Sequence, residues 1–229
     1  MCGRYAFYLP PVKLQSFFGL ENLINMPARY NCAPCQEMPI VIRNRMGFGR
    51  WGFRPEWSKQ DDLGQASKMI NARSESVADK PAFRDSWARG RRCIIPANGF
   101  FEWQKSEDKK SKQPYYIQHQ SDEILCMAGL WSKVDDCVSY TVLTKPADGD
   151  IAQYHHRMPV MLARDDISDW FQADLNGARE MIALATGQFC RAHKVARDVG
   201  KVANDHEGLI AAITNSHIEE QDSQSMLAL

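Results

Sequence analysis

The 229-residue sequence lacks several features that would assign it to a specialised class of protein. It has no net charge, with 28 basic and 28 acidic side chains, so the whole chain is not expected to act as a polybasic ligand of nucleic acid. No window approaches the roughly 18 consecutive apolar residues of a membrane-spanning helix. Residues 1–20 also lack the apolar core of a signal peptide. We therefore expect a cytoplasmic protein that does not enter a membrane.

The sequence also lacks a disulfide framework. Its seven cysteines are odd in number and show no regular spacing, which favours reduced thiols. Cys32 and Cys35 form a CxxC pair, but no second CxxC or matching pair of histidines accompanies it. We therefore expect no zinc site, and a redox or metal-sensing role for Cys32 and Cys35 stays an alternative.

No internal repeat and no linker rich in Gly, Ser or Pro divides the chain. Apolar residues make up 44% and charged residues 24%, as in ordinary globular domains. These properties predict one domain over residues 1–218, followed by a flexible tail over 219–229. Charge is uneven within that domain: residues 1–120 carry 19 basic and 11 acidic side chains, and residues 121–229 carry 9 and 17. A basic first half favours an anion-binding face, although scattered surface charge gives the same numbers.

Short runs rich in β-branched and aromatic residues dominate the middle of the chain and predict strands. Helical patterns are fewer and lie toward the two ends, and alternating βα units are absent. The sequence thus predicts an α+β fold with a mainly antiparallel sheet or partial barrel and peripheral helices. The expected strands are 39–43, 48–53, 92–96, 100–104, 115–119, 124–131, 138–144 and 160–162. The expected helices are 11–18, 81–89, 164–173, 178–185 and 207–213. We expect a hairpin turn at 45–47 and a hairpin loop at 107–113.

The first candidate for chemistry is Cys2. A small second residue generally permits removal of the initiator Met1, and Cys2 would then carry a free α-amine beside its thiol. Such an aminothiol condenses with an aldehyde to an imine, and the thiol then closes a five-membered thiazolidine. A free N-terminal residue also serves as nucleophile and base in N-terminal-nucleophile hydrolases. The alternative is that Cys2 has no function and simply lies on a frayed chain end.

Two further segments carry candidate acids and bases. Glu102 lies among aromatic residues on an expected strand, where burial would raise its pKa and suit it to proton transfer. The alternative places Glu102 on the polar face of that strand, in contact with water. His155 and Arg157 precede another apolar strand, where His155 can donate a proton while Arg157 holds an anion. A pair of ordinary loop histidines, His155 and His156, is the alternative.

Other side chains are candidates for binding a ligand. Arg73 can bind a phosphate through two hydrogen bonds, and Asn71 can orient an amine or a carbonyl. An ordinary strand-to-turn transition also explains this segment. Trp51 and Trp57 lie in the basic half and are candidates for a surface on which DNA bases stack, although most tryptophans are core residues.

Taken together, these segments resemble the SRAP family, the SOS-response-associated proteins that process abasic sites in DNA. They occur in the family's order and cover roughly residues 1–162. The matching motifs are Met1-Cys2-Gly3-Arg4, Arg29-Tyr30-Asn31 with Ala33-Pro34, Trp51-Gly52-Phe53 with Pro55 and Trp57, Ile70-Asn71-Ala72-Arg73-Ser74-Glu75, Arg92-Cys93-Ile94-Ile95-Pro96, Gly99-Phe100-Phe101-Glu102-Trp103, Ala128-Gly129-Leu130-Trp131 and His155-His156-Arg157-Met158-Pro159.

The resemblance implies a covalent DNA–protein crosslink and a peptidase activity toward the protein's own N-terminus. Cys2 would trap the ring-opened aldehyde of an abasic site in single-stranded DNA, at sites of damage in the nucleoid. The family's other catalytic residues map to Asn71, Glu102 and His155. Its DNA-contacting arginines map to Arg4, Arg73 and Arg157.

The resemblance requires no cofactor and no metal, since the aminothiol and the acid–base groups suffice, and we expect a monomer. Two other functions stay open at this point. One is an amidohydrolase that uses mature Cys2, which would turn over many substrate molecules. The other is a non-covalent binder of single-stranded DNA, whose binding would survive a Cys2→Ala change.

Overall fold

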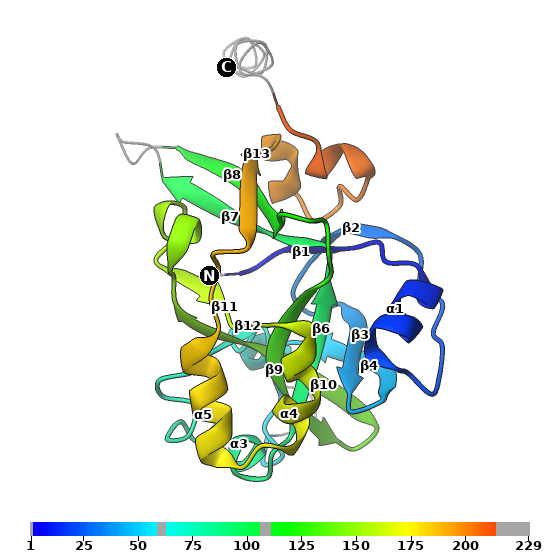
Figure 1. Ribbon diagram of the computed structural model, residues 1–229, viewed down its shortest axis with the longest axis vertical. Coiled ribbons are helices and arrows are strands. Elements are labelled where there is room, and N and C mark those ends of the chain that lie inside the picture. Colours follow the sequence, from blue (N-terminus) through cyan, green and yellow to red (C-terminus); the bar gives the residue numbers. More distant parts are fainter. Residues whose placement is uncertain (1, 59–62, 106–110, 214–229) are drawn as a thin grey trace.

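The computed structural model describes residues 2–58, 63–105 and 111–213. The chain folds into two β-sheets with short helices around them, and the larger sheet closes into a partial five-stranded barrel (Figure 1). The predicted α+β class is confirmed. None of the helices in the described residues is long and apolar enough to cross a membrane. The predicted tail at 219–229 and the domain boundary at 218 lie outside the described residues.

The larger sheet forms the barrel because strand β10 pairs on both of its sides. It runs parallel to β4 and antiparallel to β9, which closes β4, β3, β6, β9 and β10 into a ring. Three short strands extend this sheet: β5 and β11 pair with β10, and β12 pairs with β9. The bounds are β3 Glu37–Ile42, β4 Arg45–Trp51, β5 Asn71–Arg73, β6 Arg92–Ala97, β9 Leu125–Val134, β10 Cys137–Pro146, β11 Arg157–Pro159 and β12 Met161–Leu162.

The second sheet has the strand order β13-β8-β7-β1-β2 and is antiparallel throughout. One of its faces is covered by the C-terminal segment through a small apolar cluster that includes Phe101, Tyr116 and Leu209. Side chains alternate between the two faces of a strand, so the residue after Phe101 points the other way. The bounds are β1 Tyr5–Phe7, β2 Arg29–Cys32, β7 Gly99–Lys105, β8 Lys112–His119 and β13 Cys190–Lys194.

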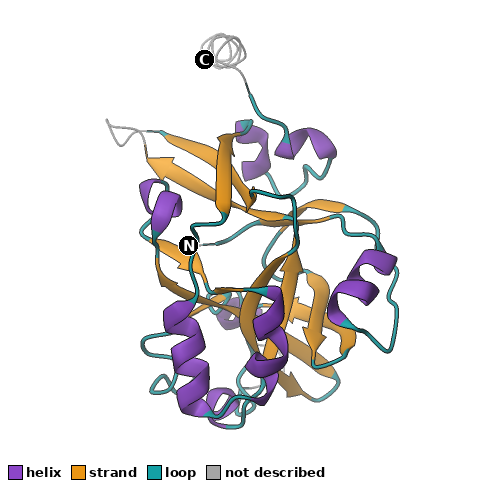
Figure 2. Cartoon of the chain, viewed as in Figure 1, coloured by secondary structure: helices purple, strands orange, loops and turns teal. Residues whose placement is uncertain are grey.

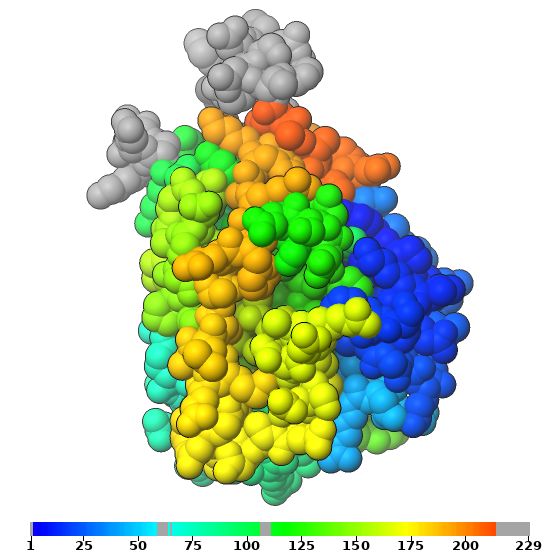
Figure 3. Space-filling model, viewed as in Figure 1, coloured from blue at the N-terminus to red at the C-terminus, as the bar shows by residue number. Residues whose placement is uncertain are grey.

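The helices lie outside the sheets (Figure 2). Arg92 of β6 fixes one helical pair, since its guanidinium donates to the carbonyl oxygens of Trp170, Ala173 and Asp174 where α4 ends and α5 begins. On the face shown in Figure 3, the blue surface of α1 and the yellow surface of α4 meet across a cleft of about 920 Å³. The helices are α1 Pro11–Phe18, α2 Leu63–Ala66, α3 Arg84–Ala88, α4 Ile167–Gln172 and α5 Leu175–Leu184, with 3₁₀ turns at Gly149–Gln153, Arg164–Asp166, Arg197–Gly200 and Glu207–Ile210.

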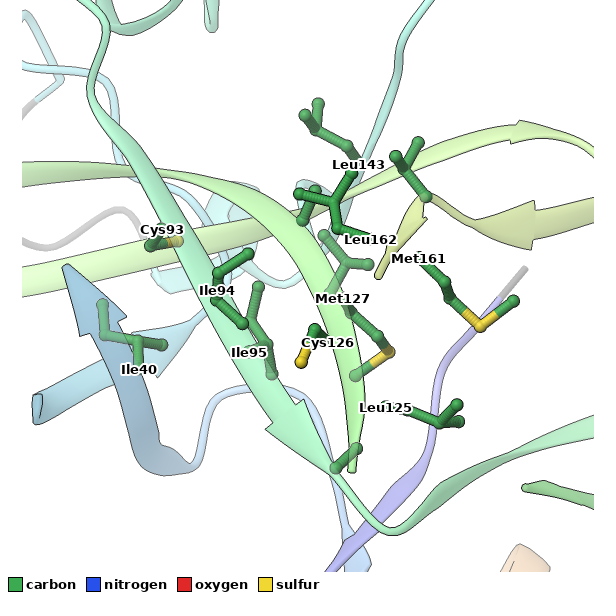
Figure 4. Close-up of a cluster of buried hydrophobic side chains, with 14 of the residues drawn as sticks. Ile40, Cys93, Ile94, Ile95, Leu125, Cys126, Met127, Leu143, Met161 and Leu162 are labelled. Atoms are coloured by element: carbon green, nitrogen blue, oxygen red, sulfur yellow. The ribbon is translucent and has the colours of Figure 1, made fainter. Parts of the chain in front are cut away.

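The main hydrophobic core fills the barrel and the space under the helices. Side chains from β3, β6, β9, β10 and β12 meet there (Figure 4), and nearly all are fully buried. Strand β6 is buried along its whole length, because both of its faces are covered. This core gives a rigid support to the short strands β5, β11 and β12, which pair with β10 and β9.

Most expected strands and helix α1 appear close to their predicted positions, but several details differ. The turn expected at 45–47 lies instead at Arg43 and Asn44, where Arg43 adopts a positive φ of 57°. Helix α5 begins earlier than predicted because the Asp174 side chain accepts a hydrogen bond from Gly177 N–H. The helix expected at 164–173 opens with a separate 3₁₀ turn, and the last predicted helix is only a 3₁₀ turn. Part of the loop predicted at 107–113 is strand β8, and residues 106–110 lie outside the described residues.

Strands β1, β2, β5, β11 and β13 are not expected from the sequence. Each is short and lacks a clear alternating pattern, so pairing with an established strand determines its conformation. Residues 29–32 form β2 against β1. Asn31 and Asp205 hold this strand to the C-terminal segment: the Asn31 amide donates to three carbonyl oxygens there, and the Asp205 carboxylate accepts the Tyr30 and Asn31 N–H groups.

Gly129 offers a test of the closed barrel. A Cβ atom added there would lie 2.6 Å from the Thr141 carbonyl oxygen on β10 and 2.5 Å from Ile95 on β6. Because the backbone contact cannot be relieved by a rotamer change, we expect Gly129→Ala to lower the free energy of unfolding by about 2 kcal/mol. Gly47→Ala is the control, since nothing lies within 4 Å of its added Cβ. Urea unfolding measures both, and equal stability of the two variants would contradict this account of the barrel.

Candidate active site

Cys2 precedes β1 of the second sheet and is hydrogen-bonded to Asn71 of β5 in the larger sheet, so it lies where the two sheets meet. Strand β1 pairs with β7, and the hydrogen bond from Phe101 N–H to the Arg4 carbonyl oxygen (2.9 Å) continues this pairing toward Cys2. The Cys2 side chain is fully buried. Burial raises the pKa of its thiol, and the nearby Glu102 carboxylate raises it further. The thiol is therefore protonated at neutral pH.

Asn71 connects Cys2 to the barrel. It opens β5, which runs parallel to β10 with Asn71 opposite Val142. Its side-chain Nδ2 donates a hydrogen bond of 2.8 Å to the Cys2 carbonyl oxygen. The barrel thus fixes the backbone of a residue that is 69 positions away in the sequence.

Glu102 approaches Cys2 from the second sheet. It follows Phe101 on β7, so its side chain points away from the C-terminal segment, and only 2% of the residue is exposed. The alternative in which Glu102 contacts bulk water is therefore wrong. Burial raises the pKa of Glu102 from 4.5 to about 7, while the positive charge of the amino terminus acts in the opposite direction. A carboxyl group with this pKa can both accept and donate a proton near neutral pH.

His155 lies just before β11, and its ring packs against that of His156 at a centroid distance of 4.3 Å and an interplanar angle of 30°. Its Nδ1 is 3.0 Å from Arg157 N and 3.1 Å from Arg157 O. The two contacts need opposite ring forms, since a backbone N–H only donates and a carbonyl oxygen only accepts. We assign Nδ1 as the acceptor on the shorter contact, to Arg157 N, and this assignment places the ring proton on Nε2. Burial, followed by the charge of the amino terminus, lowers the pKa of His155 to about 4. The ring is therefore neutral at pH 7.

The three arginines expected at DNA have different surroundings. Arg73 is exposed, and the described residues give its side chain no hydrogen bond or ion pair. Arg4 is half-buried and donates to the Gly3 carbonyl oxygen at 2.8 Å. Arg157 is buried; its Nη1 and Nη2 bind the two carboxylate oxygens of Glu75, and Nη2 also donates to the Thr144 carbonyl oxygen at 2.6 Å.

Trp51 does not line a surface, so the expectation that DNA bases stack on it is corrected. The residue has no exposed area, its Nε1 donates to the Ile70 carbonyl oxygen, and its ring packs against Tyr5 and Tyr140. The parallel pairing of β4 with β10 turns its side chain into the core. Trp57, by contrast, is 62% exposed.

The CxxC pair is split between two environments. Cys32 is fully buried and Cys35 is exposed, and neither is in a disulfide. Burial raises the pKa of the Cys32 thiol, which makes it unreactive. Within the described part of the chain, no three His, Cys, Asp or Glu side chains gather as metal ligands do.

Comparison with known proteins agrees with this arrangement. The family model described as SOS response associated peptidase (SRAP) matches residues 1–202. The chain belongs to the SRAP family. It is 36% identical to the abasic site processing protein YoaM of Bacillus subtilis, over 74% of this chain and 78% of YoaM. It is 31% identical to the abasic site processing protein YedK of Escherichia coli, over 93% of this chain and all of YedK.

Solved structures share the fold. A protein from Bacteroides thetaiotaomicron matches 93% of this chain and all of its own, with a TM-score of 0.81 at 22% identity, and this likeness concerns the fold alone. A protein from Bordetella bronchiseptica matches 85% of this chain and all of its own, with a TM-score of 0.73 at 27% identity. The fold of this chain is thus present in experimental structures.

Two residues of this SRAP site have no role assigned from the sequence. Glu75 is the last residue of the motif that contains Asn71. Thr144 is the last polar residue of the strand expected at 138–144. Both bind Arg157. A carboxylate four residues after Asn71 is a visible signal, but its partner is 82 positions away and only the fold brings them together.

The raised pKa of Glu102 predicts an effect on stability. The unfolded chain releases this proton from about pH 4.5 upward, whereas the folded protein keeps it until about pH 7, so the wild type loses stability as the pH rises between these values. From pH 4 to pH 8 the loss from this group is about 3 kcal/mol. Glu102→Gln removes this contribution. Urea unfolding of both proteins across this range measures the effect, and identical pH dependence would show that Glu102 titrates normally.

Proposed function

We propose that the protein forms a covalent crosslink between mature Cys2 and the aldehyde of an abasic site in single-stranded DNA. The observation that supports this most directly is the placement of Cys2, whose carbonyl oxygen is bound by the Asn71 amide and whose thiol lies near the Glu102 carboxyl group. The names of the similar proteins from Bacillus subtilis and Escherichia coli describe abasic site processing, which agrees with this substrate.

The Cys2 amine makes the first bond. Removal of Met1 by hydrolysis frees this amine, and we propose that Glu102 assists that step as a proton acceptor. The buried thiol is protonated and is a poor nucleophile, whereas an α-amine with a pKa near 8 is partly neutral at pH 7. The amine nitrogen attacks the sugar C1′ aldehyde, and loss of one water gives an imine.

The Cys2 thiol then closes the ring. Its sulfur bonds to the imine carbon, and the thiol proton passes through Glu102 to the imine nitrogen, which gives a thiazolidine. Only one water is lost overall, and no oxidant or cofactor takes part. With a pKa of about 7, Glu102 can take the thiol proton and return it within the same site.

His155 acts on the sugar oxygen. Its ring is neutral and carries its proton on Nε2, so it acts by donating a hydrogen bond rather than as an imidazolium acid. This hydrogen bond stabilises the charge that develops on the sugar oxygen when the furanose ring opens or when the crosslink reverses.

Arginines hold the DNA backbone. Arg73 is exposed on β5, two residues after Asn71, and is free to bind a phosphate. Arg4 lies two residues after Cys2 in the sequence and is the second arginine proposed to bind the DNA backbone. In Arg157, Glu75 binds the two terminal nitrogens, and Nε is buried without a hydrogen-bond partner among the described residues, so Arg157 reaches a DNA oxygen only where bound DNA displaces part of this packing. An abasic nucleotide has no base to unstack, so moving its sugar toward Cys2 costs little.

The crosslink predicts a complete dependence on Cys2. Mixed with a single-stranded oligonucleotide that carries one abasic site, the wild type should give a shifted band on a denaturing gel, and Cys2→Ala should give none. Cys35→Ala is the matched control, because Cys35 is exposed and outside the site, and it should react normally. A normal yield from Cys2→Ala would show that a residue other than Cys2 forms the covalent bond. Turnover of an amide substrate by the wild type would instead favour the amidohydrolase.

The role of Glu102 predicts a change in the pH profile. In the wild type the crosslinking rate should rise through pH 7 as Glu102 ionises and becomes a proton acceptor. Glu102→Gln should react at least about tenfold more slowly at pH 7 and keep only the rise near pH 8 from the amine. Its affinity for an intact oligonucleotide should not change, which controls for the binding face. A Glu102→Gln profile that retains the rise at pH 7 would remove Glu102 from the mechanism.

A further inference from the structure

Glu75 and Arg157 join the two segments that supply Asn71 and His155. Glu75 lies in the turn that follows β5, and Arg157 opens β11. The carboxylate binds Nη1 and Nη2 of the guanidinium in a two-pronged ion pair, with 2.9 Å between Nη2 and Oε2. Arg157 is only 6% exposed, so this pair is shielded from water on the arginine side. Paired hydrogen bonds of this kind fix orientation as well as distance.

Thr144 of β10 also binds Arg157, and we call the set of Glu75, Arg157 and Thr144 the junction. The Thr144 carbonyl oxygen accepts from Arg157 Nη2 at 2.6 Å and from Ser74 N–H at 2.9 Å, and Thr144 Oγ1 lies 3.2 Å from the same Nη2. Strand β10 pairs with β5 on one side and with β11 on the other near this residue. The guanidinium therefore lies where three strands meet, and Glu75 is the only acidic side chain that the described residues bring to it as an ion-pair partner.

Each end of this junction leads directly to a residue of the proposed reaction. Arg157 N–H donates to Nδ1 of His155, which keeps the ring proton on Nε2. Glu75 lies four residues after Asn71, whose amide holds the Cys2 carbonyl oxygen. A shift of β5 against β11 would separate Cys2 from His155.

The junction does not respond to pH in the physiological range. The hydrogen bond from Arg157 lowers the pKa of Glu75 to about 2, so the carboxylate stays ionised near neutral pH. A permanent ion pair suits a structural clamp better than a switch.

We propose that Glu75 is a positioning residue that clamps Arg157 and thereby sets Asn71 and His155 at the separation that the crosslinking reaction needs. This role rests on the proposed function and adds to it a residue that touches neither the sugar nor Cys2. Small displacements of reacting groups slow enzymatic reactions strongly, by up to about a hundredfold for a shift near 1 Å.

The test compares Glu75→Gln with Glu56→Gln. Glu56 is a matched control because it also pairs with arginines, Arg89 and Arg91, but lies outside the site. We expect Glu75→Gln to slow crosslinking by about tenfold to a hundredfold, and Glu56→Gln to react at the wild-type rate. Glu75→Asp keeps the charge and should recover part of the lost rate.

A second readout does not depend on the reaction. Nitrogen-15 NMR of the histidine ring, assigned with a His155→Gln variant, should show only the Nε2–H form in the wild type and in Glu56→Gln. Glu75→Gln should show a mixture of both ring forms. Wild-type rate together with an unchanged His155 signal in Glu75→Gln would overturn the clamp. If Glu75→Gln does not fold, the same two measurements on Glu75→Asp decide. If the wild type itself gives no adduct, the proposed function fails, and the NMR comparison still tests the clamp.

Discussion

The hydrogen bond from the Asn71 amide to the Cys2 carbonyl oxygen is the contact on which the site depends. The first residues of a chain are usually poorly ordered unless something ties them down. Here they continue into β1 on one side and are held on the other by β5, which pairs with β10 of the barrel. The barrel supports β5 through β10, so a rigid core stands behind the start of the chain. In the proposed function, this arrangement places the N-terminal amine and thiol at one defined position.

Burial divides the proton chemistry between two groups. It raises the pKa of Glu102 to about 7 and lowers that of His155 to about 4, because in each case it disfavours the charged form. The result is a carboxyl group that can exchange protons at neutral pH and a neutral imidazole that can donate a hydrogen bond. Protein stability is reduced to achieve this, since a buried Glu102 weakens the folded state as it ionises.

The sequence alone predicts the fold class and names the main residues of the candidate site. Runs such as 92–96 and 138–144 are long and rich in β-branched residues, so their strands are evident, and helix α1 is predicted at its observed bounds. The short strands β5 and β11 are not predicted, because a run of three residues is too short to show an alternating pattern. Only their pairing with β10 makes them strands. Cys2, Asn71, Glu102 and His155 are candidates from their chemistry and from the family motifs, since each lies within a short run of residues that can be read along the chain.

Other properties of the site cannot be predicted from the sequence without knowledge of the fold. Aromatic residues beside arginines suggest nucleic-acid binding and place Trp51 at a surface, but burial is decided by strand pairing, which no local pattern encodes. The ion-pair partner of Arg157 cannot be predicted from the sequence either, since Glu75 is 82 positions away. The pKa of Glu102 depends on which face of β7 is covered, and this too is a tertiary property.

The most direct test of the central claim is the mass of the peptide that carries the DNA adduct. The wild type is reacted with an abasic oligonucleotide, digested with nuclease and protease, and analysed by tandem mass spectrometry. The account predicts an N-terminal peptide that begins at Cys2, lacks Met1, and carries the sugar with the loss of one water, with both the amine and the thiol blocked. An adduct on a lysine, or one on a peptide that still begins with Met1, would contradict it.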